Sequence, residues 1–401
     1  MRQRPHGPSE KSLARPSAVT RARRLAALLA AGAMLGASGC RQFPESKPTT
    51  DLEQQGRRIF RDDTFGDEKF WTDTARLNEV IEHGIQPLEA LGLGLKVDMD
   101  RLNLLKFVVH NPFGVGGTKE LLRQNAVVGL RAQFRGDRIE RIGITCALCH
   151  STVDNALLPG IGHRLDGTPN KDLEVGKILA MLPPFTDAQK AVLRTWPHGT
   201  YDPRFNFDGK STPLVLPPAH GLAQVANETY TAEGPISYWN AYVAVTQMHG
   251  QGNFADPRLG VNIVQEPDLV TPKLAALRAY QHRLSRLPPP GASYDRGAAR
   301  RGKVVFDANC ARCHTGGNLT DNNAGTLHAP AETGMDPAYA ERTTQKQYRT
   351  TPLRSLWQHA PYYHDGSAKS LREVVNHYDR TLNLRLSRRQ KKDLEQYLRS
   401  L

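Results

Sequence analysis

Apolar residues recur at helical spacing in short segments of the chain, and the clearest of these lie near its C-terminus. The final stretch, LSRRQKKDLEQYLRSL, predicts a closing amphipathic helix. Its apolar positions are Leu386, Leu394, Tyr397, Leu398 and Leu401. Upstream, RGAARRGKVVFDAN predicts another helix, with Gly302 and Phe306 on one face.

The first half repeats this plan loosely. The segment EQQGRRIF gives Gly56 and Phe60 the spacing of Gly302 and Phe306, and residues 274–287 predict a further helix. Most of the remaining sequence is rich in proline and predicted coil. Glycines within residues 114–117 do not fit a phosphate-binding loop, so we interpret them as turn residues. The segment RLPPPGASYD, residues 286–295, predicts a linker between the two halves.

The beginning of the chain has a different pattern. Residues 1–24 hold seven Lys or Arg and one acid, and the apolar run LAALLAAGAMLGA then leads to ASGC, which ends at Cys40. This order predicts a secretory signal over residues 1–40. The sequence ASGC resembles the lipobox of bacterial lipoproteins, although Ala37 stands where such boxes usually carry Leu. We expect a periplasmic protein anchored to the membrane through lipidated Cys40, with an ordinary cleaved signal or an uncleaved anchor as alternatives.

The net charge of +13 depends largely on this signal. Residues 41–401 hold 46 basic and 39 acidic side chains, which leaves a charge of about +7. The sequence shows no cluster of Lys and Arg interleaved with aromatic residues, so we expect no nucleic-acid partner.

Two copies of Cys-x-x-Cys-His account for every cysteine after Cys40. They are CALCH at residues 146–150 and CARCH at residues 310–314. On a helix, the two cysteines lie on one face and can reach two vinyl groups on one edge of a porphyrin. The histidine that follows can bind the iron. We therefore predict two covalently bound haem c groups, on Cys146 and Cys149 with His150, and on Cys310 and Cys313 with His314.

These cysteines have two alternative uses, a zinc site and disulfides. A four-cysteine zinc site would have to join pairs that are far apart in sequence, and it would leave both histidines without a role. Disulfides would also leave the histidines unexplained. Export supports haem, since covalent haem attachment normally occurs outside the cytoplasm.

The haem motifs and the predicted helices together indicate the fold of the chain. A Gly/Phe helix, a haem motif and a closing helix are typical of a cytochrome c domain. The chain is thus expected to be mainly α, with two cytochrome c-like haem domains and much irregular structure. The expected parts are a lipoprotein-type signal (1–40), an N-terminal haem domain (41–285), a linker (286–295) and a C-terminal cytochrome c domain (296–401). Residues 61–140 are an insertion in the N-terminal domain.

The C-terminal 110 residues resemble the second domain of the bacterial di-haem cytochrome c peroxidase superfamily, which includes the enzyme that matures tryptophan tryptophylquinone and related di-haem oxygenases. The run YRTTPLRSLWQHAPYYHDGSAKSLREVVNHYDR, residues 348–380, carries the resemblance. In the first half it rests on CALCH, GIGHRLDG and FNFDGK. The resemblance implies electron transfer between two haems and a redox partner, a small cytochrome or cupredoxin, that donates or accepts electrons.

The resemblance also suggests further iron ligands. His163, in the I-G-H segment after the first motif, is the candidate for the first haem. Tyr378 stands where the peroxidases use a methionine and where the cofactor-maturing relative has tyrosine, so it is the candidate for the second haem. Tyrosine is a known haem iron ligand. The alternatives are Met181, His220, Met248 and His249 for the first iron, and His364, His377 and Met335 for the second. A Ca²⁺ ion often joins the domains in this superfamily, and Asn170 is a weak match for one of its ligands.

Two departures bear on activity. Phe207 of FNFDG stands where the superfamily carries the tryptophan between the haems. The following segment also lacks the superfamily's acid–base pattern, so Glu228 and Glu233 are weak candidates for that role. Two functions therefore remain open: a peroxidase-like oxidoreductase that activates peroxide or dioxygen at one haem, and a membrane-anchored electron carrier without substrate turnover.

Overall fold

The structure, a computed structural model, describes residues 49–285 and 288–401. The expected signal with Cys40 and residues 286–287 of the expected linker lie outside the described residues. Within the described part, no helix combines the length and the apolar character needed to cross a membrane.

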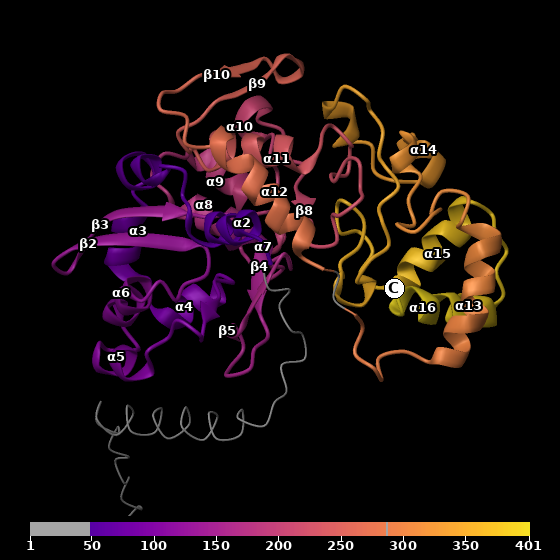
Figure 1. Cartoon of the computed structure of the whole chain (residues 1–401), viewed down its shortest axis with the longest axis horizontal. Helices are drawn as coiled ribbons and strands as arrows, with labels where there is room; N and C mark the ends of the chain where they lie inside the picture. The colour runs from indigo at the N-terminus through magenta and orange to yellow at the C-terminus, as the bar shows by residue number, and fades with distance from the viewer. Residues whose placement is uncertain (1–48, 286–287) are drawn as a thin grey trace, which may run out of the picture. The chain divides into compact units, whose positions relative to one another are not determined.

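Short helices alternate with short strands before the linker (Figure 1). The elements of this half are α2 (Asp51–Asp62), η1 (Phe70–Thr74), α3 (Leu77–Gly84), α4 (Pro87–Gly92), β1 (Val97–Asp98), α5 (Leu104–Val109), α6 (Val115–Arg123), β2 (Leu130–Arg135), β3 (Arg138–Ile144), α7 (Ala147–His150), β4 (Ser151–Val153), β5 (Ile161–Gly162), β6 (Arg164–Asp166), α8 (Val175–Met181), α9 (Asp187–Leu193), β7 (Thr200–Tyr201), α10 (Phe205–Asp208), β8 (Leu214–Val215), α11 (Ile236–Tyr242), η2 (Val243–Gln247), β9 (Phe254–Asp256), η3 (Pro257–Leu259), β10 (Val261–Ile263), η4 (Thr271–Lys273) and α12 (Leu274–Arg283).

The half that follows is helical with long connecting loops (Figure 1). Its elements are α13 (Arg296–Asn309), η5 (Asn322–Ala324), α14 (Pro330–Thr333), η6 (Ala340–Arg342), η7 (Leu356–Gln358), α15 (Leu371–Thr381) and α16 (Arg388–Arg399). The predicted closing helix is confirmed as α16. It begins with a capping box formed by Ser387 and Gln390.

The expectation of a mainly α chain needs correction. The described residues form a mixed fold that includes five two-stranded sheets: β2 with β3, β4 with β6, β7 with β8 and β9 with β10 are antiparallel, and β1 with β5 is parallel. Only two residues separate the end of β3 from the start of α7, so Cys146 lies next to the end of a strand. Except for β2 and β3, these strands are only two or three residues long, too short to give an alternating signal in the sequence.

The two halves contain alike helix pairs. Gly56 of α2 lies against α12, where an added Cβ would come within 1.9 Å of the Ala276 carbonyl oxygen. Gly302 of α13 lies in the same way against α16, with an added Cβ 2.0 Å from the Asp393 carbonyl oxygen. In both places, only glycine allows the helices to approach this closely. The predicted repeat of Gly56 and Gly302 is therefore present as repeated helix packing.

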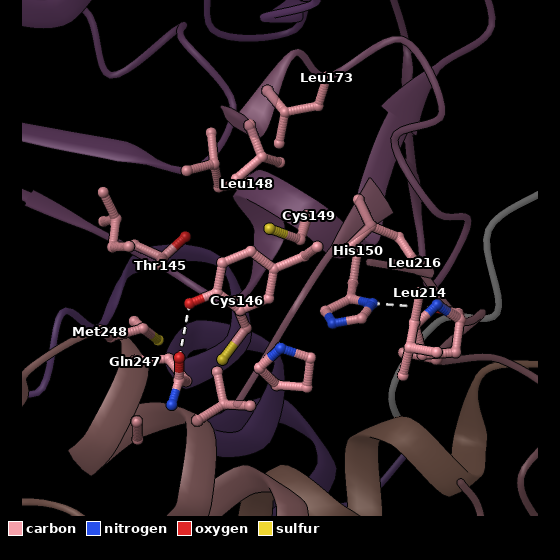
Figure 2. A pocket seen from close by; sticks show the side chains of 18 of the residues that line it. Thr145, Cys146, Leu148, Cys149, His150, Leu173, Leu214, Leu216, Gln247 and Met248 are labelled. Carbon is pink, nitrogen blue, oxygen red and sulfur yellow. Dashed lines mark hydrogen bonds between the residues drawn. The ribbon is translucent and has the colours of Figure 1, made fainter. Parts of the chain in front are cut away.

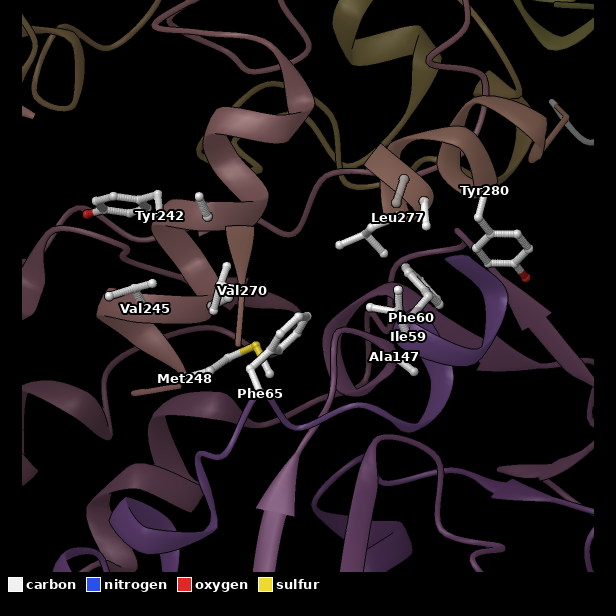
Figure 3. Packing of buried hydrophobic residues seen from close by; sticks show 14 of the residues in the cluster. Ile59, Phe60, Phe65, Ala147, Tyr242, Val245, Met248, Val270, Leu277 and Tyr280 are labelled. Atoms are coloured by element: carbon white, nitrogen blue, oxygen red, sulfur yellow. The ribbon is translucent and has the colours of Figure 1, made fainter. Parts of the chain in front are cut away.

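Aromatic packing follows the same repeat. Phe60 meets Tyr280 of α12 edge to face with ring centroids 5.6 Å apart, and Phe306 meets Tyr397 of α16 at 5.1 Å. Both phenylalanines are almost completely buried. Figure 3 shows Phe60 and Tyr280 in the core of the first half, where Phe65 and Met248 also pack.

The insertion, residues 61–140, is an ordered layer with its own core. Helices α3 and α6 pack with the β2–β3 hairpin around buried apolar residues that include Ile81, Leu122 and Ile142. Within it, the Thr118 hydroxyl donates to the Ile85 carbonyl at 2.7 Å.

Candidate haem sites

A cavity of about 290 Å³ opens at the first Cys-x-x-Cys-His motif. Cys146, Cys149 and His150 form part of its wall (Figure 2). Apolar side chains make up most of the remainder, from α3 and α8 on the one hand and from residues 214–222 and α11 on the other. A wall of this kind suits a porphyrin, whose face is apolar.

The first motif presents its groups in the way that haem attachment requires. The Nδ1 atom of His150 lies 3.0 Å from the Pro217 carbonyl oxygen. A carbonyl only accepts hydrogen bonds, so Nδ1 carries the proton and the lone pair of Nε2 is left for a metal. Burial lowers the pKa of His150, which keeps the ring neutral. Burial also raises the pKa of both thiols to about 12.

The second motif repeats this geometry. The Nδ1 atom of His314 donates to the Leu319 carbonyl oxygen at 3.0 Å, and burial lowers the pKa of its ring. The residues present at both motifs therefore fit covalent haem: two unpaired thiols and one oriented, neutral imidazole in each.

The structure brings Tyr378 to the second motif. Burial, together with the nearby thiols of Cys310 and Cys313, raises the pKa of Tyr378 to about 12. A buried phenol of this kind becomes a phenolate only beside a strong positive charge, such as a ferric iron. Tyr378 therefore stays the candidate ligand for the second haem.

The alternative ligands for the second iron are engaged elsewhere. His377 Nε2 donates to the Thr333 carbonyl oxygen at 2.8 Å. His364 stacks on Tyr348 and exchanges a hydrogen bond with its hydroxyl group. Met335 packs against the cluster of Leu214, Tyr339 and Tyr348.

The first cavity does not contain His163. Its Nδ1 lies 2.9 Å from an Asp100 carboxylate oxygen in a partly exposed ion pair, and His163 is not among the residues that line the cavity. His249 stacks on Phe70 and His220 contacts Gln358, also away from the wall. The structure instead places Met181 and Met248 in the wall, so these two alternatives are closer to the first haem site.

Glu228 and Glu233 have different surroundings. Glu228 lines the cavity, and it is the single acidic residue among the described residues that do so. Its Oε2 atom is buried and has no hydrogen-bond partner in the described part. Glu233 does not line the cavity; Arg204 and the Thr231 hydroxyl hold its carboxylate. The structure therefore separates these two candidates.

Polar residues that the sequence did not single out also line the cavity. The Tyr201 hydroxyl donates to Gln247 Oε1 at 2.6 Å, and burial raises the pKa of Tyr201 (Figure 2). Trp239 and Asn240 of α11 also line it. None of them belongs to a motif, so only the fold could have found them. Phe207, in contrast, is 42% exposed and is absent from the wall.

The sequence raised two further metal sites, a four-cysteine zinc site and a Ca²⁺ site. The one group of three potential ligands among the described residues is Cys313, Asp321 and His328; it joins no second cysteine pair, so a four-cysteine zinc site does not form. His328 already lies between Asp321 and Glu332. Asn170 leaves one buried amide oxygen without a partner in this part of the chain, whereas Ca²⁺ takes six to eight oxygens. The Ca²⁺ site therefore stays a prediction.

Comparisons with known proteins agree with the sequence resemblance. Residues 299–401 match the cytochrome c family. The chain is 34% identical over 88 residues to the methylamine utilization protein MauG of Methylophilus methylotrophus, which is 20% of this chain and 26% of that protein. It is 31% identical over 120 residues to MauG of Methylorubrum extorquens, which is 26% of this chain and 34% of that protein.

Two solved structures are similar over part of the chain. One is hydrazine synthase of Kuenenia stuttgartiensis, with a TM-score of 0.34, 18% identity and coverage of 47% of this chain and 73% of that one. The other is a MauG-like protein associated with microbial copper homeostasis, with a TM-score of 0.27, 21% identity and coverage of 35% and 62%. The family and sequence matches confirm the resemblance to the di-haem cytochrome c peroxidase superfamily, and they span about a third or less of the relatives' length.

Proposed function

We propose that this chain is a di-haem c-type oxidoreductase in which the first haem activates peroxide and the second relays electrons. The observation that carries the proposal is the cavity at the first motif, with a single acidic side chain, Glu228, in an otherwise mostly apolar wall. A haem bound at this motif would supply the redox chemistry on peroxide.

The contribution of the protein follows from three groups. His150, oriented by the Pro217 carbonyl, would bind the haem iron through Nε2. Glu228 has an oxygen free of hydrogen bonds to move a proton between the two peroxide oxygens. Tyr378 would be a ligand of the second haem iron, which would suit that site to electron transfer. The apolar wall excludes water from the reacting oxygens.

Peroxide is favoured over dioxygen because its cleavage needs one proton-transferring group, which Glu228 supplies. The electrons come from a redox partner protein, a small cytochrome or cupredoxin, through the second haem. We further propose a periplasmic location with a lipid anchor at Cys40, on the evidence of the N-terminal pattern alone.

A second function rests on a specific observation. Met181 and Met248 also line the first cavity, and either sulfur would close the first iron if it bound there. The protein would then be an electron carrier without substrate turnover.

Spectroscopy of the purified di-haem protein separates the two. The proposal expects a high-spin ferric signal from one haem, a spectral change with hydrogen peroxide, and carbon monoxide binding after reduction. Replacement Glu228→Gln should lower peroxide-dependent turnover by about 100-fold. The matched control Glu89→Gln, at an exposed position on α4, should leave it unchanged. A fully low-spin spectrum that does not change with hydrogen peroxide or carbon monoxide would instead support the electron carrier without substrate turnover.

A further inference from the structure

Glu228 needs a source of protons, and the cavity wall around it offers none. Reduction of hydrogen peroxide to two waters takes up two electrons and two protons. His150 and Glu228 are the only histidine and the only acid among the described residues of the wall, and His150 is committed to iron. The Glu228 side chain is 2% exposed, so bulk water does not reach it directly.

One titratable side chain connects Glu228 to the surface. His282 Nε2 lies 3.5 Å from Glu228 Oε1, and the His282 side chain is 26% exposed. This separation is that of an ion pair and exceeds a good hydrogen bond by a few tenths of an ångström. His282 Nε2 has no hydrogen-bond partner elsewhere in the described part. A small rotation of the ring therefore completes a hydrogen bond to Glu228 without breaking another one.

The last turn of α12 holds His282 in place. Its neighbour Gln281 lines the cavity and exchanges hydrogen bonds of 2.7 and 3.1 Å with the Asn240 amide of α11. One residue earlier, the Tyr280 hydroxyl donates to buried Asp166 at 2.6 Å. Successive residues of a helix point about 100° apart, so these anchors fix the direction of His282.

Arg349 holds the segment that carries Glu228, the partner of His282. Its Nη2 donates to the Glu228 backbone carbonyl at 3.0 Å, and its backbone N–H donates to the Tyr230 carbonyl at 2.9 Å. Burial lowers the pKa of Arg349 to about 10, and Glu228 partly offsets this effect. The guanidinium therefore remains charged at neutral pH beside Glu228.

We propose that His282 is the proton relay of the first haem site, passing protons from solvent to Glu228. This inference rests on the proposed function. A proton from water binds the His282 ring at Nδ1, and a proton passes from Nε2 to Glu228 Oε1. Rotation of the protonated carboxyl group then presents this proton to peroxide. Each cycle returns both side chains to their starting state, so the two protons taken up come from solvent and the two electrons from the redox partner.

The test compares three forms of the di-haem protein: wild type, His282→Gln, and the control His83→Gln, an exposed histidine of α3. His282→Gln should lower peroxide turnover about tenfold, less than loss of Glu228 itself, and should raise the solvent deuterium isotope effect. In His282→Gly, added imidazole should restore turnover. A purely structural role would give a slower protein that imidazole does not rescue, and that result would overturn the relay.

A spectroscopic measurement is independent of turnover. The carboxylate stretch of Glu228, identified in infrared difference spectra by its loss in Glu228→Gln, should shift in His282→Gln and stay unchanged in His83→Gln. An unshifted band would show that the two groups are not coupled. If wild type ignores peroxide, the proposed function fails; if Glu228→Gln is slow and His282→Gln is as fast as wild type, only the relay fails.

Discussion

At the residue scale, the chemistry is set by which polar side chains the fold leaves without partners. His150 and His314 each donate a hydrogen bond from Nδ1 to a backbone carbonyl, which leaves Nε2 available to a metal. Glu228 has a buried carboxylate oxygen without a partner in the described chain, whereas the carboxylate of Glu233 forms an ion pair with Arg204. Two glutamates that looked equivalent in the sequence therefore differ in what they can do.

The ligand assignment of Tyr378 gives a prediction at this scale. Replacement Tyr378→Phe should change the ferric spectrum of the second haem and raise its reduction potential, because an anionic phenolate stabilises ferric iron. Optical and electron paramagnetic resonance spectra and a redox titration would measure this. The control Tyr363→Phe, whose ring packs against Tyr378, should leave the spectrum nearly unchanged. An unshifted potential in Tyr378→Phe would remove this residue from the iron.

At the element scale, the haem motifs are held by two alike pairs of helices. Each pair meets at a glycine, Gly56 or Gly302, and each is extended by a phenylalanine–tyrosine contact four residues on. Replacement Gly302→Ala should therefore lower the free energy of unfolding by about 1–3 kcal/mol, since the new Cβ would overlap the α16 backbone.

Chemical denaturation would measure this cost. Gly316→Ala is an unsuitable control because Gly316 has a φ of +68°. Gly317→Ala, where an added Cβ meets nothing within 4 Å, is a matched one and should change stability little. Equal stability of both variants would contradict the close packing of α13 and α16.

Asp166 links several elements of the first half. It is fully buried and accepts hydrogen bonds from Arg61 of α2, Arg164, Ser151 and Tyr280 of α12. Burial alone would raise its pKa, but Arg164 and Arg61 hold the pKa of Asp166 well below its usual range. A carboxyl with a lowered folded pKa stabilises the protein above its unfolded pKa of about 4, and this stabilisation fades as the pH falls further.

Asp166→Asn should therefore destabilise the protein by about 3–5 kcal/mol at pH 7, because it leaves Arg61 and Arg164 without their charge partner. The difference from wild type should shrink below about pH 4. Thermal unfolding followed across pH measures both. A difference that grows at low pH would contradict this account.

The sequence predicted α2, α12, α13 and α16 together with both haem motifs. Apolar residues at helical spacing and the Cys-x-x-Cys-His pattern can each be recognised within a short segment. It did not predict the cavity wall. Tyr201, Gln247 and Trp239 converge on the first haem site from separate segments, and no local pattern marks such convergence. His163 shows the converse: a matching I-G-H segment ends in an ion pair with Asp100, because the insertion supplies an acid beside it.

At the scale of the whole molecule, the described residues belong to one compact unit, and buried ion pairs join the half before the linker to the half after it. Arg342 of η6 pairs with Asp202 and Asp208 of the first half at 2.8 Å, and its side chain is 4% exposed. Arg342→Gln should cost about 3–5 kcal/mol and should split a single calorimetric unfolding transition into two. A single transition in the variant would show that Arg342 does not control the coupling of the halves.

The central claim is that two haem groups are covalently attached to this chain. Intact-mass analysis of protein produced in a host competent for haem attachment tests it most directly. We predict the mass of the polypeptide plus two haems for wild type, and plus one haem for each of the double variants Cys146→Ala/Cys149→Ala and Cys310→Ala/Cys313→Ala. A wild-type mass with no haem or with a single haem would contradict the account.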